Sequence, residues 1–198
     1  MAFSLIDQHA SGACTNFDYS GFWNRSLLMA AACRELGAGR ELGAPDELFT
    51  IGLLAQIGQL ALATAFPKEI SNLTVLDITR ADLLQREKAV TGTDHLALSV
   101  ALMEHWGIAI DYARPFGLHE VPDPGLFSAN AKLADRARLA HGAWWMARVL
   151  ARADLDAVLA EPECLAALQW LKLDAGSLTQ QLHAIESSWR VWLQLIAH

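Results

Sequence analysis

The sequence is poor in the residues that build strands and disulfide frameworks. It contains 2 tyrosines and 3 cysteines in 198 residues, and valine and isoleucine are far outnumbered by alanine and leucine. This composition favours helices over strands, so we predict an all-α fold. Cys14, Cys33 and Cys164 are odd in number and widely spaced. They are typical of reduced thiols, because their spacing matches neither a disulfide framework nor a zinc site.

Several functional signals are also missing. The formal net charge is −7, and no cluster of lysine and arginine interrupts it, which argues against nucleic acid or an anionic membrane as a partner. The first ten residues lack a basic region followed by an apolar run, so no signal peptide is visible and we expect a cytoplasmic protein. The motifs GxGxxG, GxSxG and HExxH and the P-loop are absent, which leaves phosphate-cradle, serine-nucleophile and zincin functions without support.

The most apolar part of the sequence is the stretch Pro45–Phe66. It opens with a proline and two acids, as helix starts do, and Pro67 stops it. Because apolar residues occupy both sides of the helix, we predict a central helix surrounded by other helices. A membrane span is the competing interpretation. Gln56, Gln59 and the acidic flank favour the buried helix.

Helical periodicity predicts further helices on both sides of this stretch. We expect a lead-in over residues 1–16, one helical domain over 17–152 and a C-terminal helical extension over 153–198 packed on it. We expect a helix to begin at Asp18, and Thr79 or Asp77 and then Asp94 to cap two further helices of the domain. Gly176 is expected to separate two helices in the extension.

Histidine and aspartate side chains raise the question of a metal site. His95 opens a predicted helix, His119 precedes Glu120 in a loop rich in helix breakers, and Asp135 lies on the long helix that follows. A metal requires several donors that converge on one point. Two histidines and one aspartate, far apart in sequence, do not establish such a site by themselves.

Five segments resemble the HDOD family, which is related to the HD-type metal-dependent phosphohydrolases. They are FWNRSL, FTIGLLAQIGQL, REKAVTGTDHLALSVALMEHWGI, HEVPDP and KLADRA. The resemblance spans about residues 17–140, and residues 126–198 resemble the helical tail that usually follows. It implies an HD-domain-like helical bundle around the central helix, and it suggests that the chain holds the second half of a full HDOD module.

The resemblance also implies that the metal ligands are degenerate. In catalytic HD relatives, a histidine on the first helix and a His-Asp pair on the central helix hold the metal. Here Arg25 takes the place of the first histidine, and Ala55 and Gln56 take the place of the pair. Two ligands and one negative charge are therefore replaced by a methyl group and an amide, and a permanent cation is added. We expect no bound metal, no cofactor and no hydrolysis, since the metal supplies the nucleophile in HD enzymes.

The remaining positions predict a vestigial pocket. His95 and His119 match ancillary positions of the family, and Asp135 matches its late aspartate. We expect these residues to meet Arg25 and Gln56, with Arg25 paired to Asp135 or hydrogen-bonded to Gln56.

Seven tryptophans suggest either a large helical core or an interaction surface. Adjacent residues on a helix point about 100° apart, so Trp144 and Trp145 are not expected to face the same core. We therefore single out Trp145 and Trp192 as candidates for an exposed patch that binds a partner domain or a second copy.

Three functions remain open at this stage. The favoured one is a non-catalytic regulatory and protein-interaction module in bacterial signal transduction. By resemblance, its partner would be an adjacent receiver, GGDEF or EAL domain, and a homodimer is also open. The alternatives are a metal phosphohydrolase with an aberrant ligand set and a small-molecule or nucleotide sensor that uses the vestigial pocket.

Overall fold

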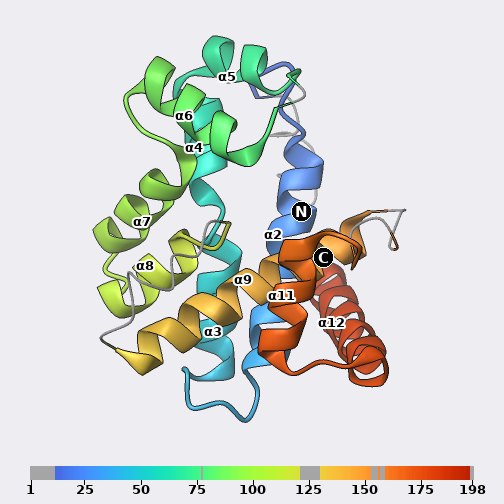
Figure 1. The fold of residues 1–198 in the computed structure, drawn as a ribbon. Coiled ribbons are helices and arrows are strands. Elements are labelled where there is room, and N and C mark those ends of the chain that lie inside the picture. The colour runs from blue at the N-terminus through green and yellow to red at the C-terminus, as the bar shows by residue number, and fades with distance from the viewer. Residues whose placement is uncertain (1–11, 77, 121–129, 153–155, 157–158, 197–198) are drawn as a thin grey trace.

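The computed structural model describes residues 12–76, 78–120, 130–152, 156 and 159–196, and within these ranges it contains helices but no strand (Figure 1). The all-α prediction is confirmed. The helices are α2 Tyr19–Gly37, α3 Pro45–Leu54, α4 Ile57–Ala65, α5 Pro67–Leu73, α6 Arg80–Thr91, α7 His95–His105, α8 Ile110–Gly117, α9 Ala131–Ala151, α11 Pro162–Leu171 and α12 Ala175–Ile196.

Side-chain caps fix the starts of several helices. The side chains of Asp18, Thr79 and Asp94 accept hydrogen bonds from backbone N–H groups in the first turns of α2, α6 and α7. These caps agree with the predicted helix starts; Asp77, the alternative to Thr79, lies outside the described residues. Asn130 caps α9, which begins at Ala131.

The central stretch is not one continuous helix, contrary to our prediction. It is divided into α3 and α4 at Ala55 and Gln56, where the backbone N–H of Ala55 bonds the carbonyl of Gly52 at 3.4 Å instead of continuing the α-helical ladder. By length and composition, Pro45–Ala65 is the one stretch of the described chain apolar enough to cross a membrane, and half of its most apolar window is buried inside the protein.

Two glycines let the central stretch approach its neighbours closely. A Cβ on Gly52 would lie 2.8 Å from the Cys33 sulfur and 3.0 Å from Cα of Ala30, both on α2. A Cβ on Gly58 would overlap the backbone carbonyl of His95, at the start of α7. The two halves of the central stretch are therefore held against different helices, α3 against α2 and α4 against α7.

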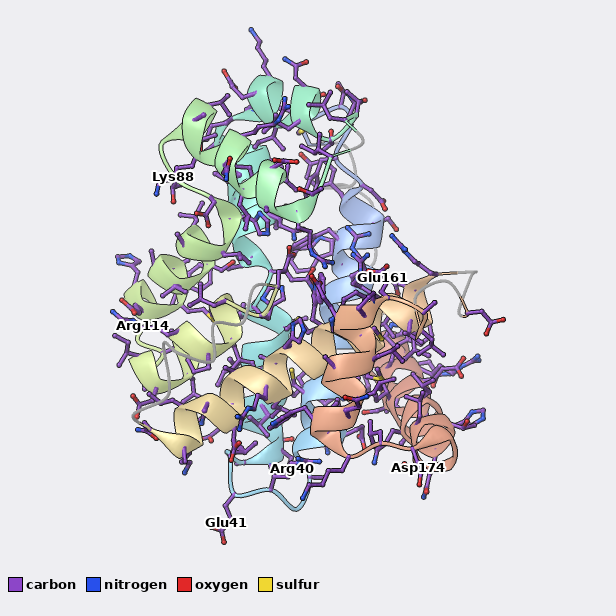
Figure 2. The ribbon with its side chains drawn as sticks, viewed as in Figure 1. Arg40, Glu41, Lys88, Arg114, Glu161 and Asp174 are labelled. Atoms are coloured by element: carbon purple, nitrogen blue, oxygen red, sulfur yellow. The ribbon has the colours of Figure 1, made fainter. Side chains whose placement is uncertain are left out.

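The core lies between α2, α3 and α9, and charged side chains such as Lys88, Arg114 and Asp174 lie at the periphery (Figure 2). Trp145 belongs to this core and is 0% exposed, so our assignment of Trp145 to an interaction surface is wrong. Trp192 stacks on Phe49 with ring centroids 4.3 Å apart, and it too packs inward. Trp106 is the tryptophan with a large exposed fraction, 51%, among the described residues.

The C-terminal helices pack on the rest of the bundle. Helix α12 lies against α2, and α11 lies against α9. The break between them is at Lys172, which has a left-handed φ of 58°, and Gly176 lies inside α12 rather than between the helices. Asp174 provides the local hydrogen bonds at this break because its carboxylate accepts from the backbone N–H of Ser177 at 2.8 Å. The division of the chain at residue 152 stays a prediction.

Candidate functional site

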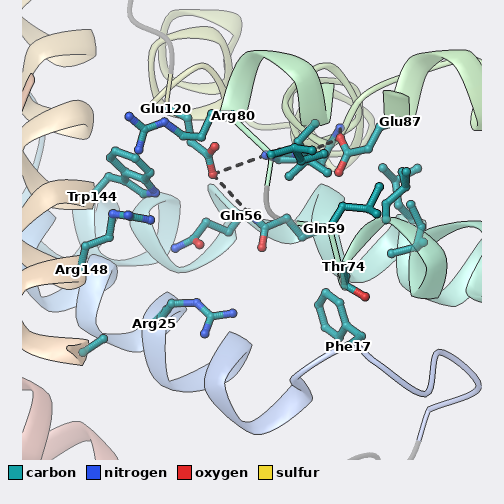
Figure 3. A pocket seen from close by; sticks show the side chains of 18 of the residues that line it. Phe17, Arg25, Gln56, Gln59, Thr74, Arg80, Glu87, Glu120, Trp144 and Arg148 are labelled. Carbon is teal, nitrogen blue, oxygen red and sulfur yellow. Dashed lines mark hydrogen bonds and ion pairs between the residues drawn. The ribbon is translucent and has the colours of Figure 1, made fainter. Parts of the chain in front are cut away.

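A pocket of about 470 Å³ opens between α2, the α3–α4 break, α5, α6 and α9 (Figure 3). Its wall combines charged, amide and apolar side chains. The polar and aromatic members are Phe17, Arg25, Gln56, Gln59, Thr74, Arg80, Glu87, His95, Glu120, Trp144, Arg148 and Arg152. Gln56, at the α3–α4 break, forms part of this wall.

The buried polar centre of the pocket is an ion triad of one histidine between two glutamates. Glu87 Oε2 lies 2.7 Å from His95 Nδ1 and also accepts the backbone N–H of His95 at 3.0 Å. Glu120 Oε1 lies 3.4 Å from His95 Nε2, an ion-pair distance without the alignment of a good hydrogen bond. His95 is 1% exposed, and both glutamates are buried as well.

The charges of this triad stabilise one another. Burial alone would lower the pKa of His95, but the close contact and charge of Glu120 and the hydrogen bond and charge of Glu87 outweigh it and raise the pKa to about 10. Burial would likewise raise the pKa of Glu120, but the close positive charge of His95 lowers it to about 2. His95 is therefore an imidazolium at neutral pH, and Glu120 is a carboxylate.

His119 lies behind the pocket wall in a different state. Its Nδ1 lies 2.9 Å from the carbonyl oxygen of Phe116, which only accepts, so Nδ1 carries the proton. Complete burial lowers the pKa of His119 to about 4, although the charge of Glu120 opposes the shift. Two histidines near one glutamate thus have opposite protonation states, because only His95 is close to two carboxylates.

His141 continues this buried network, and it connects α9 to the segment before residue 121. The indole N–H of Trp145 donates to His141 Nε2 at 3.1 Å, and His141 Nδ1 donates to the carbonyl of His119 at 2.8 Å. Both ring nitrogens are used, so the neutral tautomer is fixed. We infer a structural role for His141 and for the hydrogen bond that anchors Trp145.

The arginine side of the pocket comes mainly from α6 and α9. The guanidinium of Arg80 lies 4.7 Å from the centroid of the Trp144 ring and forms an ion pair with Glu163 of α11. Arg148 lies 4.8 Å from the same centroid. Arg152 pairs with Glu161 at 3.9 Å.

The structure brings together three of the five residues predicted for the vestigial pocket. Arg25, Gln56 and His95 line it, and His119 lies next to it with Nε2 3.8 Å from Glu120 Oε1. Asp135 does not belong to it. Its carboxylate is exposed on α9 and pairs with Arg138 at 3.0 Å.

The predicted partners of Arg25 are also wrong. Arg25 pairs at 3.5 Å with Asp18, the N-cap residue about two turns earlier, rather than with Asp135. Gln56 donates to the sulfur of Met29 at 3.5 Å, and Gln59 donates to Glu120 at 3.3 Å. The two glutamine side chains therefore donate hydrogen bonds to residues on two sides of the pocket.

Sequence reasoning missed the roles of Glu87, Glu120, Arg80 and Arg148. Glu120 was noted beside His119, but its partner is His95, which is 25 positions earlier. Glu87 and His95 are separated by the left-handed turn at Gly92, so no single helical period connects them. The available signal in the sequence was a glutamate, Glu87, shortly before the Gly-Thr-Asp-His segment that begins α7.

The donors present do not fit the metal that catalytic HD relatives bind. Arg25, Ala55 and Gln56 offer no anionic or imidazole donor. No group of three or more His, Cys, Asp or Glu side chains in the described part of the chain has a geometry suited to an ion.

The chain belongs to the HDOD family, because the model of the HDOD domain matches residues 1–122. This confirms the resemblance drawn from the sequence. No protein with curated annotation matches the chain.

Solved structures share the fold. The MmoQ response regulator from Methylococcus capsulatus str. Bath has a TM-score of 0.75 and 30% identity, covering 91% of this chain and 68% of that chain. A fragment of the same protein has a TM-score of 0.68 and 30% identity, covering 84% and 62%. A protein provisionally named a phosphohydrolase, from Shewanella amazonensis SB2B, has a TM-score of 0.66 and 22% identity, covering 95% and 67%. The chain thus spans about two thirds of the length of each.

Proposed function

We propose that this chain is a non-catalytic regulatory module in bacterial signal transduction. Membership of the HDOD family and 30% identity to a protein named a response regulator support this role. By resemblance, the module acts through a protein partner or an adjacent receiver, GGDEF or EAL domain.

The observation that carries the proposal is the ion triad of Glu87, His95 and Glu120. An imidazolium between two carboxylates already neutralises one of the two negative charges, with Nδ1 2.7 Å from Glu87 and Nε2 3.4 Å from Glu120. Arg25 adds a permanent cation to the opposite wall. A divalent cation placed in this pocket would meet like charge and few donors.

Metal analysis and turnover assays test the non-catalytic part. The purified full chain is loaded with manganese, iron or zinc, freed of excess metal, and assayed on phosphodiesters including cyclic dinucleotides, with a catalytic HD hydrolase as positive control. We expect substoichiometric metal and no turnover. Stoichiometric metal with turnover that is lost in His95→Gln but kept in His105→Gln would establish the alternative, a phosphohydrolase with an aberrant ligand set. His105 is a suitable control because it is exposed on the same helix.

Titration against candidate partners tests the regulatory part. Receiver, GGDEF and EAL domains from the same genome are titrated with the purified chain, and both binding and the catalytic output of the partner are measured. We expect a one-to-one complex with at least one domain and a change in its output. A failure of all of them to bind contradicts the partner classes taken from the resemblance.

A further inference from the structure

We propose that the pocket binds an organic anion of metabolite size, with its charged group between Arg148 and Arg25 and its apolar part on the opposite wall. The inference goes beyond the proposed regulatory role, because it concerns a ligand and holds whichever protein partner the chain has. The shared chemistry is an oxyanion, carboxylate or phosphate, attached to an apolar group.

The size and lining of the pocket suit such a ligand. A volume of about 470 Å³ is in the range of small-molecule sites, which are mostly apolar with a few placed polar groups. The polar groups are concentrated on α2 and α9 and around the ion triad. Apolar side chains of α4, α5, α6 and the segment between α5 and α6 form a continuous part of the lining: Leu62, Ile70, Leu73, Leu76, Ile78 and Leu83.

Arg148 is the pocket cation that lacks a counterion. Arg25, Arg80 and Arg152 each pair with a carboxylate outside the pocket, whereas Arg148 forms no ion pair or hydrogen bond within the described chain. Its Nε is buried without an acceptor. In Figure 3 its side chain extends from α9 below Trp144 and points toward Gln56.

The aromatic contacts of Arg148 do not replace a counterion. Its guanidinium carbon lies 4.8 Å from the Trp144 centroid and 5.4 Å from the Trp145 centroid. Such contacts stabilise the cation through the ring faces but accept no N–H bond in the guanidinium plane. Burial and the neighbouring charges of Arg152 and Arg80 lower the pKa of Arg148, and the more distant charges of Glu161 and Glu120 oppose that shift without forming an ion pair with it. A bound oxyanion would supply both the missing charge and the missing acceptor.

The carboxylates in the pocket do not repel such an anion strongly. Glu87 and Glu120 face His95, whose positive charge lies between them. Glu120 Oε1 also accepts from the Gln59 amide at 3.3 Å. The guanidinium groups of α2 and α9 consequently dominate the part of the pocket away from the triad.

A matched pair of fluorescent probes tests the proposal. 1-Anilinonaphthalene-8-sulfonate carries an anionic group on an apolar skeleton, and N-phenyl-1-naphthylamine has the same skeleton without the charge. We expect the sulfonate to bind one site per chain and Arg148→Gln to weaken it about tenfold or more, as loss of a charged hydrogen bond does. Arg190→Gln, which removes an exposed arginine on α12, is the control and should leave binding unchanged. Binding of the neutral probe should be the same in all variants.

Competition distinguishes the source of the anion. Displacement of the sulfonate by octanoate indicates a carboxylate ligand, and displacement by phenyl phosphate indicates a phosphate ligand; either supports the site. Equal binding of the sulfonate to wild type and Arg148→Gln overturns the proposal, as does equal weakening by Arg190→Gln or displacement by neither competitor. If Arg148→Gln does not fold, Arg25→Gln decides, because Arg25 is partly exposed and its loss leaves the core intact. Turnover and metal content play no part in these readouts, so failure here leaves the proposed function standing.

Discussion

Replacing His95 with an uncharged residue would expose how much the fold depends on the buried ion triad. In His95→Gln, Glu87 and Glu120 lose the positive charge that lies within 2.7 Å of one and 3.4 Å of the other. Removing one partner of a buried ion pair leaves the other charge uncompensated and typically costs about 3–5 kcal/mol. We expect the free energy of unfolding to fall by about that amount, while His105→Gln on the same helix should leave it nearly unchanged.

The pH dependence of stability isolates the charge of His95 from its packing. The folded chain keeps the His95 proton up to a pKa of about 10, whereas an unfolded histidine loses it around pH 6.5. The folded state therefore binds more protons than the unfolded state between these values, and stability falls as pH rises. Between about pH 6.5 and about pH 8, linkage gives a loss of roughly 1–2 kcal/mol from this one group.

Urea unfolding followed by tryptophan fluorescence measures both effects. The reference is a variant in which Glu87, His95 and Glu120 are all glutamine, which keeps shape and hydrogen-bonding capacity but removes the three charges. As pH rises over the same interval, the free energy of unfolding of wild type should fall by about 1–2 kcal/mol more than that of this variant, since the other groups that titrate there are common to both. Identical pH slopes for the two proteins would show that His95 is not protonated in the fold and would refute the electrostatic argument.

Three further perturbations test the packing and the second buried histidine. Trp145→Ala should lower the free energy of unfolding by about 3–5 kcal/mol because the side chain is completely buried. Trp106→Ala, at an exposed tryptophan, should change it by less than about 0.5 kcal/mol. Equal effects of the two substitutions in urea unfolding would contradict the burial of Trp145. Gly58→Ala should cost roughly 1–3 kcal/mol because its Cβ would overlap a backbone carbonyl of α7. Gly176→Ala in α12 should stabilise by up to about 1 kcal/mol, because its Cβ would meet only an ordinary contact with Asp174 at 3.6 Å. Thermal melts of both variants check this. Lowering pH from about 6.5 to about 4 should destabilise the protein by up to roughly 1.4 kcal/mol per unit through His119, which the unfolded chain protonates but the fold holds neutral. His119→Gln should reduce this loss of stability at low pH. If the variant loses as much stability as wild type over this pH range, the His119 imidazole is not held neutral in the fold.

The sequence was sufficient for features that depend on a few neighbouring residues. Asp18, Thr79 and Asp94 each precede a helix and accept its first N–H groups, because a short polar side chain at that place has a backbone donor within reach. Gly92 ends α6 with a φ of 86°, a conformation that glycine adopts at no steric cost. The all-α class followed from the same local information.

Features that depend on packing between distant segments were not predictable in this way. The α3–α4 break has no proline or glycine at Ala55 and Gln56; it follows from contacts of the two halves with α2 and α7. Trp144 and Trp145 are both buried although they point in different directions, because α9 is covered by other helices on more than one side. The spacing of apolar residues along the sequence predicts neither the α3–α4 break nor the burial of both tryptophans.

The sequence predicted where the candidate site lies but not all of the charged residues that form it. Arg25, Gln56 and His95 meet in one pocket, as expected from the resemblance. The state of His95 depends on Glu87 and Glu120, which reach it across a turn and from another segment. Charge states of buried groups follow from such three-dimensional neighbours, so they were accessible only from the structure.

The placement of α9 has a consequence for dissecting this polypeptide. The HDOD match ends at residue 122, yet Trp144 and Trp145 fill the interior and Arg148 forms part of the pocket wall. A recombinant piece that stops at the family boundary would lack these side chains and would leave the apolar faces of α2 and α8 uncovered. The autonomous folding unit is therefore larger than the segment by which the family is recognised, and truncations should retain residues through at least Ala151.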